Sequence, residues 1–591
     1  MSRGAILTIA AILVVAAGVW WWLLRPVPPG TREMEAAVAT RLAGPAPRAG
    51  AGHGIERRRA WAMVRRFYKE HGGHAAWTDI DGPKPVAFEA VRLLLDSDRD
   101  GLDPTAYGAA DLLAALRTTR PWWNELAIRA ESLAALDVRI TTAMCRCAYD
   151  LRNGRFPRGA LDPDWGARPD SLGLATTLSA AASRHRLQAV FDTLPPPHPF
   201  YHALRELLAA HRAYAAAGGW PLVPDGPTLA RGARGPRVAA LRHRLAITGD
   251  LKGAADRDVY DAELQRAVLG FQARCGLSLT GSVGSATLAA LNVPVSERIH
   301  QIELTLERMR WLPRHLPEPY ILVNIPAYHL DVVNDGRDSL SMNVVVGQPK
   351  SPTPVFTDVV TYLVLNPQWT LPKRILVEEV LPAFKHDPDY FTKHELHVFF
   401  THERVPREVP PDSVDWRTTQ TDSFPFIVRQ DAGPENPLGR IKFMCPNEYD
   451  VYLHDTNGRI HFRSASRDLS HGCVRVAEPE SLAEYVLRGT PQASRDSVVS
   501  LLEGGAWRQI GLKRPIPVHI VYWTAWADSV GAPQFRGDLY GIDQRMAEAL
   551  RGGNVGEFVL NPKVVWGDSA AAAEAALTPL PPSKPGIFGR R

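Results

Sequence analysis

The sequence predicts a multidomain α + β protein: an N-terminal transmembrane helix, a helical region, a three-helix bundle and a mostly-β domain with an inserted segment. Three observations support this fold class. The chain has 591 residues, too many for one ordinary domain. Helical periodicity in the first half gives way to strand-like alternation from about residue 318. With 45% hydrophobic and 22% charged residues, the chain can form several cores, which excludes wholesale disorder.

Charge and cysteine content narrow the class of protein. With 68 basic and 63 acidic residues the net charge is +5. This mildly basic balance suits contact with an anionic polymer and gives no support for nucleic-acid binding. Five cysteines are too few for a disulfide-framed mini-protein, and their odd number leaves at least one thiol unpaired within a monomer.

Residues 1–30 are expected to form a signal anchor and a linker. Within them, residues 4–24 carry no charge, and a helix of that length just spans a bilayer core of about 30 Å. Residues 20–22 are tryptophans at the far end, where amphipathic rings prefer the interface. The alternative is a cleaved signal, for which residues 16–18 offer only a weak site. On either interpretation the chain is exported or anchored.

Residues 35–220 are predicted to be a helical domain. Helix-type periodicity runs through residues 109–116 and 125–151. After a proline-rich break at 194–199, another predicted helix, 201–217, ends at two glycines. No spacing in this half matches a catalytic signature, so we interpret it as a scaffold.

A helical bundle is predicted at residues 225–295. Val238, Leu241 and Leu245 follow the i, i+3, i+7 spacing of one buried helix face, and residues 264–271 carry a second apolar stripe. Glycines between and after these stripes mark helix ends and turns, which predicts three short helices.

Residues 318–530 are predicted to form a mostly-β domain. Residues 320–325 and 329–333 alternate as strands do and lead into a turn typical of a hairpin. A polar, proline-rich insert at 374–430 interrupts the pattern, and inserts of this size usually serve as lids or substrate-binding loops. Residues 560–591 are expected to be a disordered tail.

One group of residues in this domain indicates chemistry. Cys473 stands between a glycine and an aliphatic residue in Ser470-His471-Gly472-Cys473-Val474-Arg475, and His454 precedes it by 19 residues. A cysteine beside histidine or arginine has its pKa lowered, and the thiolate is a nucleophile. His454, at a strand end, is placed to take the thiol proton, and amides of Gly472 and Cys473 could meet an oxyanion.

Longer strings resemble known domains. The bundle, with Tyr260-Asp261, Phe271-Gln272 and its glycines, is similar to the small peptidoglycan-binding domain of cell-wall enzymes. The cysteine string and His454 resemble the L,D-transpeptidase catalytic domain. The match extends through the segments 366–372, 433–439, 442–443, 446–447 and 451–456. Pro437 and Cys445 depart from that pattern. From about residue 55 to 530 the chain is similar to large Gram-negative L,D-transpeptidases with a helical scaffold, a peptidoglycan-binding domain and a capping insert.

The resemblance assigns roles to the site residues. It implies that Cys473 is the nucleophile and His454 the general base, with His471 as the alternative base. Gly472, His471 and Ser470 would support the oxyanion and the turn.

Three further residues are candidates for substrate binding. Arg475 would hold a substrate carboxylate, unless it forms a structural ion pair. Trp369 either lines the groove or packs into the core. Asp455 is a candidate for substrate binding or for orienting His454, but neighbours in a strand face opposite ways, which favours a backbone carbonyl as the histidine's partner.

The resemblance also implies a reaction and a location. The thiolate would attack the third residue of a peptidoglycan tetrapeptide stem and release D-alanine, and a stem amine would resolve the thioester to a 3→3 cross-link. No metal or organic cofactor is needed, and carbapenems are expected to acylate Cys473. With the N-terminal helix in the inner membrane, the catalytic region would lie in the periplasm.

Three other functions stay open at this point. A zinc hydrolase could use His454, His461, His471 and Cys473, although their spacings fit none of the usual ligand pairs. Water could resolve the same thioester, which would make the protein an L,D-carboxypeptidase or a cross-link hydrolase. A non-catalytic wall-binding scaffold is the third alternative, although it would not need Cys473 and His454.

The remaining cysteines suggest structural roles. Cys145 and Cys147 are two apart in a predicted helix, where side chains diverge, so we do not expect them to pair. Cys275 is expected to pack in the bundle. A disulfide between Cys445 and Cys473 would inactivate the site.

Overall fold

The computed structural model divides the chain into two compact units, Met1–Arg155 with Arg168–Pro197, and Phe156–Ala167 with His198–Arg591. The structure describes residues 30–45, 54–118, 126–157, 171–252, 257–401, 406–419, 424–552 and 555–561. Each unit has its own hydrophobic core, so each is described by itself.

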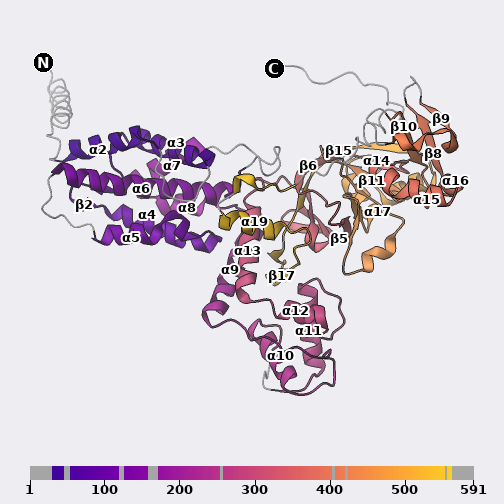
Figure 1. Cartoon of the computed structure of the whole chain (residues 1–591), viewed down its shortest axis with the longest axis horizontal. Helices are drawn as coiled ribbons and strands as arrows, with labels where there is room; N and C mark the ends of the chain where they lie inside the picture. Colours follow the sequence, from indigo (N-terminus) through magenta and orange to yellow (C-terminus); the bar gives the residue numbers. More distant parts are fainter. Residues whose placement is uncertain are drawn as a thin grey trace, which may run out of the picture. The chain divides into compact units, whose positions relative to one another are not determined.

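The described part of the first unit is mainly helical (Figure 1). Its helices are α2 (Thr31–Ala43), α3 (Gly54–Glu70), α4 (Pro85–Leu95), α5 (Ala109–Thr118), α6 (Leu126–Asn153), α7 (Ser171–Ser183) and α8 (Leu187–Asp192), with a short hairpin of β1 (Thr78–Asp79) and β2 (Gly82–Pro83). A buried carboxylate fixes that hairpin, because Asp137 of α6 accepts the N–H groups of Trp77 and Thr78, each at 2.7 Å. Burial raises the pKa of Asp137.

The expected fold class needs one correction. Among the residues that the structure describes, no helix has both the length and the apolar character needed to cross a bilayer. The transmembrane helix included in the expected fold class was therefore wrong for the described fold, which is a multidomain α + β architecture with helical regions and a β-rich domain. Residues 4–24, on which that expectation was placed, lie outside the described residues.

The second unit begins with two helices that contact each other and a small bundle that lies between them in the chain. The helices α9 (Pro199–Ala216) and α13 (Val295–Met309) contact each other and flank the bundle of α10 (Pro236–Ile247), α11 (Ala262–Arg274) and α12 (Ser285–Leu291). The two apolar stripes expected from spacing form the bundle's core, as Val238, Leu241, Leu264 and Val268 are all fully buried. Asp261 caps α11 by accepting the N–H of Leu264.

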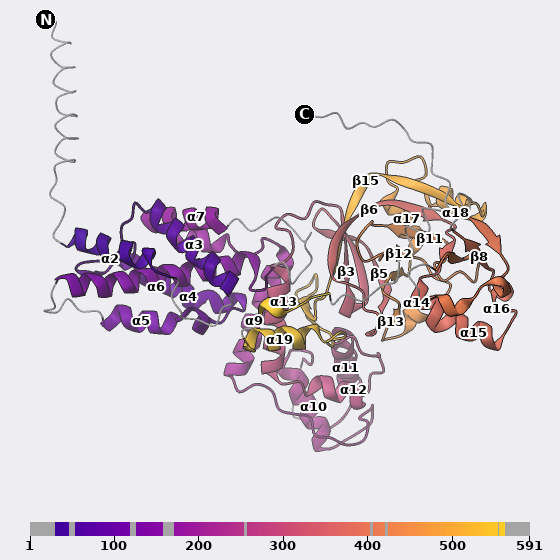
Figure 2. The same ribbon diagram turned by 45° about the horizontal axis from the view of Figure 1, so that its top comes forward.

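A nine-stranded sheet forms the centre of this unit (Figure 2). In spatial order its strands are β13 (Asp468–Ser470), β5 (Arg337–Gly347), β14 (Val474–Val476), β12 (Leu453–His454), β11 (Ile441–Met444), β6 (Phe356–Leu365), β15 (Arg508–Val521), β3 (Tyr320–Asn324) and β4 (His329–Asn334). β4 also pairs with β5, so the sheet curls back onto itself. The helices α17 (Pro479–Val486) and α18 (Arg495–Glu503) precede β15 in the chain.

The segment expected as a lid or loop is a folded element with its own core. β7 (Trp369–Thr370), β10 (Phe426–Gln430), β8 (Leu396–Phe400) and β9 (Arg407–Val409) form a second sheet. Three short helices and one π-helical turn accompany it: α14 (Lys373–Ile375), the turn Leu376–Val380, α15 (Leu381–His386) and α16 (Tyr390–Lys393). Phe391, Val398 and Val428 are buried in its core.

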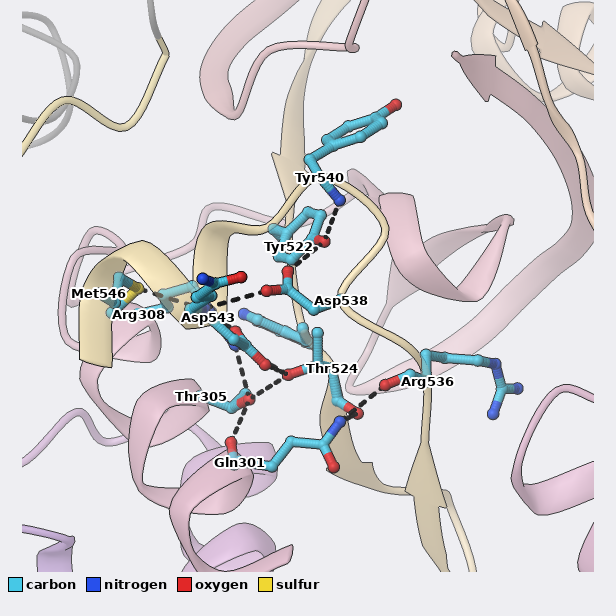
Figure 3. Close-up of polar contacts among 12 residues, drawn as sticks. Gln301, Thr305, Arg308, Tyr522, Thr524, Arg536, Asp538, Tyr540, Asp543 and Met546 are labelled. Carbon is cyan, nitrogen blue, oxygen red and sulfur yellow. Dashed lines mark hydrogen bonds and ion pairs between the residues drawn. The ribbon is translucent and has the colours of Figure 1, made fainter. Parts of the chain in front are cut away.

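The chain after β15 returns to the core of the unit. It forms β16 (Ala525–Ala527), β17 (Pro533–Phe535) and α19 (Ile542–Gly552). Figure 3 shows how α19 is attached to α13: Arg308 forms an ion pair with Asp543 and donates to Thr524. Further on, Asn561 forms hydrogen bonds of 2.9 Å with both the N–H and the carbonyl of Val355.

Candidate active site

The nine-stranded sheet and the insert line a common cavity of about 560 Å³. Six of the eight site residues expected from the sequence line it, namely Trp369, His454, Ser470, His471, Cys473 and Arg475. Gly472 and Asp455 are not among its lining residues. The volume lies within the range of small-molecule sites.

Strand register brings the lining side chains onto one face. The parallel pair β12–β14 sets His454 opposite Arg475, and the antiparallel pair β11–β12 sets Lys442 opposite His454. Directly opposed residues share a face of a sheet, and so do residues two apart in a strand. Cys473, two residues before Arg475, therefore faces the same side. The result is a row of Lys442, His454 and Arg475 with the thiol beside it.

His454 is a buried, neutral imidazole with a defined tautomer. Its Nδ1 lies 2.5 Å from the carbonyl oxygen of Asp455, so the neutral ring carries its proton there and leaves the Nε2 lone pair as the acceptor. Burial is the main cause that lowers the pKa of His454 to about 3, and the positive charges of Arg475 and Lys442 act in the same direction. The partner is a backbone carbonyl, the alternative that strand geometry favoured.

The turn before Cys473 is held by hydrogen bonds to a serine and a threonine. Ser470 Oγ accepts the N–H of Gly472 at 3.1 Å and donates to the carbonyl of Cys473 at 2.6 Å. Gly472 has a φ of +122°, a conformation that favours glycine. Its carbonyl accepts the hydroxyl of Thr353 at 2.7 Å. The N–H of Gly472 already donates to Ser470 within the turn, so it is not free to bind an oxyanion.

Cys473 is a half-buried thiol near positive charge. Its Sγ lies 3.9 Å from the carbonyl oxygen of Asp450. Burial raises the pKa of the thiol, while the N–H of Tyr452 and the charges of Lys442 and Arg475 oppose that rise. Thiol and imidazole are therefore both neutral at rest.

The three candidate substrate-binding residues lie in different surroundings. Arg475 lines the cavity, and its Nε is buried without a hydrogen-bond partner among the described residues. Trp369 lines the cavity and also packs against the core of the insert. Asp455 is buried outside the cavity, where its carboxylate accepts the N–H of Arg440 at 2.8 Å and pairs with Arg459 at 2.9 Å.

His471, in the segment Ser470–Arg475, contacts the insert through an ion pair. Its Nε2 lies 2.7 Å from a carboxylate oxygen of Glu379, which belongs to the π-helical turn Leu376–Val380. Such turns often occur at functional sites. Glu379 also lines the cavity, so the insert contributes a carboxylate to it.

Sequence reasoning missed several residues that position the site. Lys442 was noted only as part of a matching string, although alternation along β11 could have placed it beside His454. Thr353 and Tyr540 were missed altogether. The N–H of Thr353 donates to the Tyr540 hydroxyl at 3.2 Å, which in turn donates to the carbonyl of Gly347 at 2.5 Å. No local sequence signal connects residues so far apart.

The remaining cysteine and histidine candidates lie as follows. Cys445 lines the cavity, and burial raises its pKa to about 12. Cys445 and Cys473 are both free thiols. His461 is not among the lining residues. In the described part of the chain, no group of three or more His, Cys, Asp or Glu side chains is arranged to hold a metal ion.

Comparison with known protein families gives three matches. A family described as "Scaffold domain" matches residues 62–208, and one described as "Putative peptidoglycan binding domain" matches residues 234–291. The "L,D-transpeptidase catalytic domain" matches residues 318–498, which include Cys473 and His454.

Individual proteins are similar over parts of the chain. A curated "Putative L,D-transpeptidase" of Haemophilus influenzae is 34% identical over 251 residues, which are 42% of this chain and 48% of that protein. The chain thus spans about half the length of this relative. A solved L,D-transpeptidase (residues 123–326) from Xylanimonas cellulosilytica shares 18% identity with a TM-score of 0.16, covering 50% of this chain and 99% of its own. Another, from Stackebrandtia nassauensis, shares 14% with a TM-score of 0.20, covering 51% and 96%.

The family matches agree with the elements described above. The scaffold match covers mostly helices of the first unit, the second match covers the bundle of α10–α12, and the third covers most of the nine-stranded sheet and the insert. The chain therefore carries a scaffold domain, a peptidoglycan-binding domain and an L,D-transpeptidase catalytic domain.

Proposed function

We propose that the protein is a cysteine L,D-transpeptidase that forms 3→3 cross-links in peptidoglycan. The observation that supports this most directly is the arrangement of Cys473 and His454. Both open into one cavity, His454 from β12 and Cys473 from the position directly before the parallel strand β14, and the tautomer of His454 leaves Nε2 able to accept a proton. A nucleophile and a base so arranged are what acyl transfer requires.

The acylation step follows from this arrangement. The thiol proton moves to Nε2 of His454 as the sulfur attacks the carbonyl carbon of the third stem residue. The bond from that carbon to the nitrogen of D-alanine then breaks, and the imidazolium returns its proton to the leaving amine. The products are a thioester on Cys473 and free D-alanine.

An amine completes the cycle. The side-chain amine of a second stem attacks the thioester carbonyl and gives a proton to His454. The C–S bond then breaks, and the imidazolium passes that proton to the sulfur, which restores the thiol of Cys473 and the neutral imidazole. If water attacks instead, the same thioester gives a free carboxylate and no cross-link.

Charge at the cavity suits an anionic donor. Lys442 and Arg475 lie in the same row as His454, and the Nε of Arg475 has no hydrogen-bond partner among the described residues. Guanidinium groups bind carboxylates well, so we assign Arg475 to a carboxylate of the donor stem. The protein would act on peptidoglycan in the periplasm or cell wall, and carbapenems would acylate Cys473.

The test uses disaccharide-tetrapeptide and the purified protein, with products identified by mass spectrometry. We expect a dimer that lacks one D-alanine, and we expect Cys473→Ala to abolish it. Cys145→Ala, which removes a buried thiol in the first unit, is the matched control and should keep the activity.

The other outcomes separate the alternatives. Tripeptide without dimer, dependent on Cys473, would identify an L,D-carboxypeptidase. No product at all from the parent protein would contradict the catalytic proposal and favour a wall-binding scaffold.

A further inference from the structure

Asp450 adds a carboxylate to the cavity that holds Cys473 and His454. Its carbonyl oxygen lies 3.9 Å from Sγ of Cys473, so a group that attacks a thioester on this sulfur comes within reach of the same residue. Among the residues that the structure describes, the Asp450 side chain forms no hydrogen bond and no ion pair. Partial burial raises the pKa of its carboxyl group, and the charge of Lys442 opposes that rise. The cavity therefore holds a partly desolvated acid that no described side chain binds.

The loop before β12 fixes Asp450 in this place. Asp450 has a φ of +52°, a conformation that residues other than glycine rarely adopt. The side chain of Asn447 holds the loop around it: its nitrogen donates to the carbonyls of Cys445 and Val451, at 2.6 Å and 2.7 Å. Its oxygen accepts the N–H groups of Tyr449 and Val451, at 3.0 Å and 3.3 Å. Backbone held in so sparsely populated a conformation is typical of functional sites.

Two other carboxylates line the cavity, and both are exposed. Glu379 lies within 2.7 Å of His471, and Glu435 belongs to the loop before β11. Among the described lining residues, Asp450 is the acid that is half-buried and adjoins the nucleophile. A half-buried carboxylate attracts a cation more strongly than an exposed one, because water and salt screen it less. Asp450 is therefore the best placed of these acids to bind a positively charged group.

The amine that resolves the thioester brings a proton that His454 does not remove. A primary amine, with an ordinary pKa of about 10.4, enters as an ammonium and has no lone pair for attack. During aminolysis His454 takes the proton that the amine loses on bonding to carbon, and passes it to the sulfur. The extra proton of the ammonium must leave earlier, to another base. Water enters uncharged and needs no such step.

We propose that Asp450 binds the ammonium group of the acceptor stem and takes its first proton. An N–H bond of the ammonium breaks, the proton moves to a carboxylate oxygen of Asp450, and the electron pair stays on nitrogen. The neutral amine then attacks the thioester carbonyl, and its next proton goes to His454 and on to the sulfur of Cys473. Asp450 releases its proton to water when the cross-linked product leaves. The assignment rests on the proposed function, because it takes an amine as the acceptor.

Loss of water on binding favours this proton transfer. An acceptor that fills the cavity displaces water from both charged groups, which raises the pKa of a carboxyl group and lowers that of an ammonium. Before the acceptor arrives, the charge of Lys442 favours the ionised form of Asp450. Asp450 thus attracts the ammonium as an anion and accepts the proton once water has left.

Asp450→Asn tests this role in the full chain. Asparagine adopts the same left-handed backbone conformation readily, so the loop is retained. Disaccharide-tetrapeptide serves as both donor and acceptor, and mass spectrometry measures dimer and tripeptide. We expect the ratio of dimer to tripeptide to fall about tenfold or more, because the amine needs the carboxylate and water does not.

Two controls separate the proton transfer from other effects. Glu448→Gln removes the same charge from an exposed residue of the same loop that is not among the lining residues, and it should change the ratio less than about twofold. Hydroxylamine, which is uncharged at neutral pH, resolves the thioester without the first proton transfer. The ratio of hydroxamate to tripeptide should therefore be alike in the parent protein and in Asp450→Asn. Formation of hydroxamate also shows that the variant is folded and acylated.

The outcomes separate this inference from the proposed function. A parent-like ratio of dimer to tripeptide in Asp450→Asn overturns the role of Asp450, while dimer formed by the parent protein still supports the proposed function. An equal fall in the ratio with hydroxylamine also overturns that role, because the loss would not depend on the charge of the acceptor. Absence of D-alanine release by the parent protein instead overturns the proposed function.

Discussion

At the scale of single residues, protonation decides how the site can work. Burial raises the pKa of the Cys473 thiol and lowers the pKa of His454 to about 3. Lys442 and Arg475 lie in the same row as His454, and their positive charge disfavours an imidazolium there. The resting pair is consequently thiol and neutral imidazole, so proton transfer accompanies attack rather than preceding it.

The pH dependence of alkylation tests this state. We expect the rate at which iodoacetamide modifies Cys473 to keep rising above pH 9, because burial raises the thiol's pKa. Lys442→Met should move the profile to still higher pH, since it removes a charge that favours the thiolate. Mass spectrometry of the Cys473 peptide gives the rates. A plateau already reached at pH 6 would instead indicate a thiolate–imidazolium pair.

Thr353 is expected to position the nucleophile's turn. Its hydroxyl accepts the N–H of Gly347 at 2.9 Å and donates to the carbonyl of Gly472, next to Cys473. We expect Thr353→Val to lower kcat about 10- to 100-fold, because small displacements of a nucleophile are costly, with little change in KM. Thr353→Ser keeps the hydroxyl and should retain most of kcat. Release of D-alanine measures kcat. An equal loss of kcat in both variants would show that Thr353 acts through packing and not through the hydrogen bonds of its hydroxyl group.

The sequence singled out the candidate nucleophile and base, but not the residues that hold their turn in place. The signature string and the spacing to His454 indicated nucleophile and base, because those groups are close in the chain or lie at strand ends. Thr353 and Tyr540 hold the same turn from 120 residues before and 67 residues after Cys473. Such contacts depend on tertiary packing, which local patterns do not encode.

At the scale of elements, alternation predicted the strands of the sheet but not the insert. Residues 320–325 and 329–333 are paired strands in the structure, as expected. The insert was expected to be a lid or a substrate-binding loop, and its short strands and helices were not predicted; its aromatic residues form a separate core around Phe391 and Trp416. Its strands are short and separated by prolines and turns, so the alternation of apolar and polar residues within each is too short to predict a strand.

The contact between α13 and α19 gives a stability prediction. Arg308 is buried and paired with Asp543, and Arg308→Met would leave that carboxylate without its ionic partner. We expect a loss of about 3–5 kcal/mol in the free energy of unfolding of the second unit.

Arg212→Met is the matched control for this loss. It breaks a more exposed pair with Glu303, at 2.8 Å, and should cost at most about 1 kcal/mol. Urea unfolding of both variants measures the difference, and equal losses would contradict a stabilising role for the buried pair.

At the scale of the whole molecule, the second unit extends beyond the predicted catalytic domain. The expected end was residue 530, but Ile542, Met546 and Leu560 belong to the same core as the sheet. The predicted domain ended shortly after the last predicted strand, because the residues beyond it match no part of the catalytic-domain pattern. This segment also supplies Tyr540, whose hydroxyl accepts the N–H of Thr353, the residue that bonds the carbonyl of Gly472 before Cys473.

Buried histidines should make the second unit more sensitive to acid than the first. Burial lowers the pKa of His454 to about 3 and that of His519 to about 4, and both side chains are nearly inaccessible. Between those values and the ordinary value near 6.5, the unfolded chain binds more protons than the folded one, so stability falls as pH falls. By pH 5 each histidine should cost about 2 kcal/mol.

The first unit provides an internal reference for this effect. Two of its groups act in opposite directions: burial raises the pKa of Asp137, which adds stability as pH falls, and lowers the pKa of His71, which removes stability. Thermal unfolding between pH 7 and pH 5 should therefore shift the transition of the second unit downward more than that of the first. His519→Asn should remove part of the shift, because His454, His198 and His211, whose pKa values burial also lowers, still take up protons only in the unfolded chain. A shift of unchanged size in that variant would show that the sensitivity arises elsewhere.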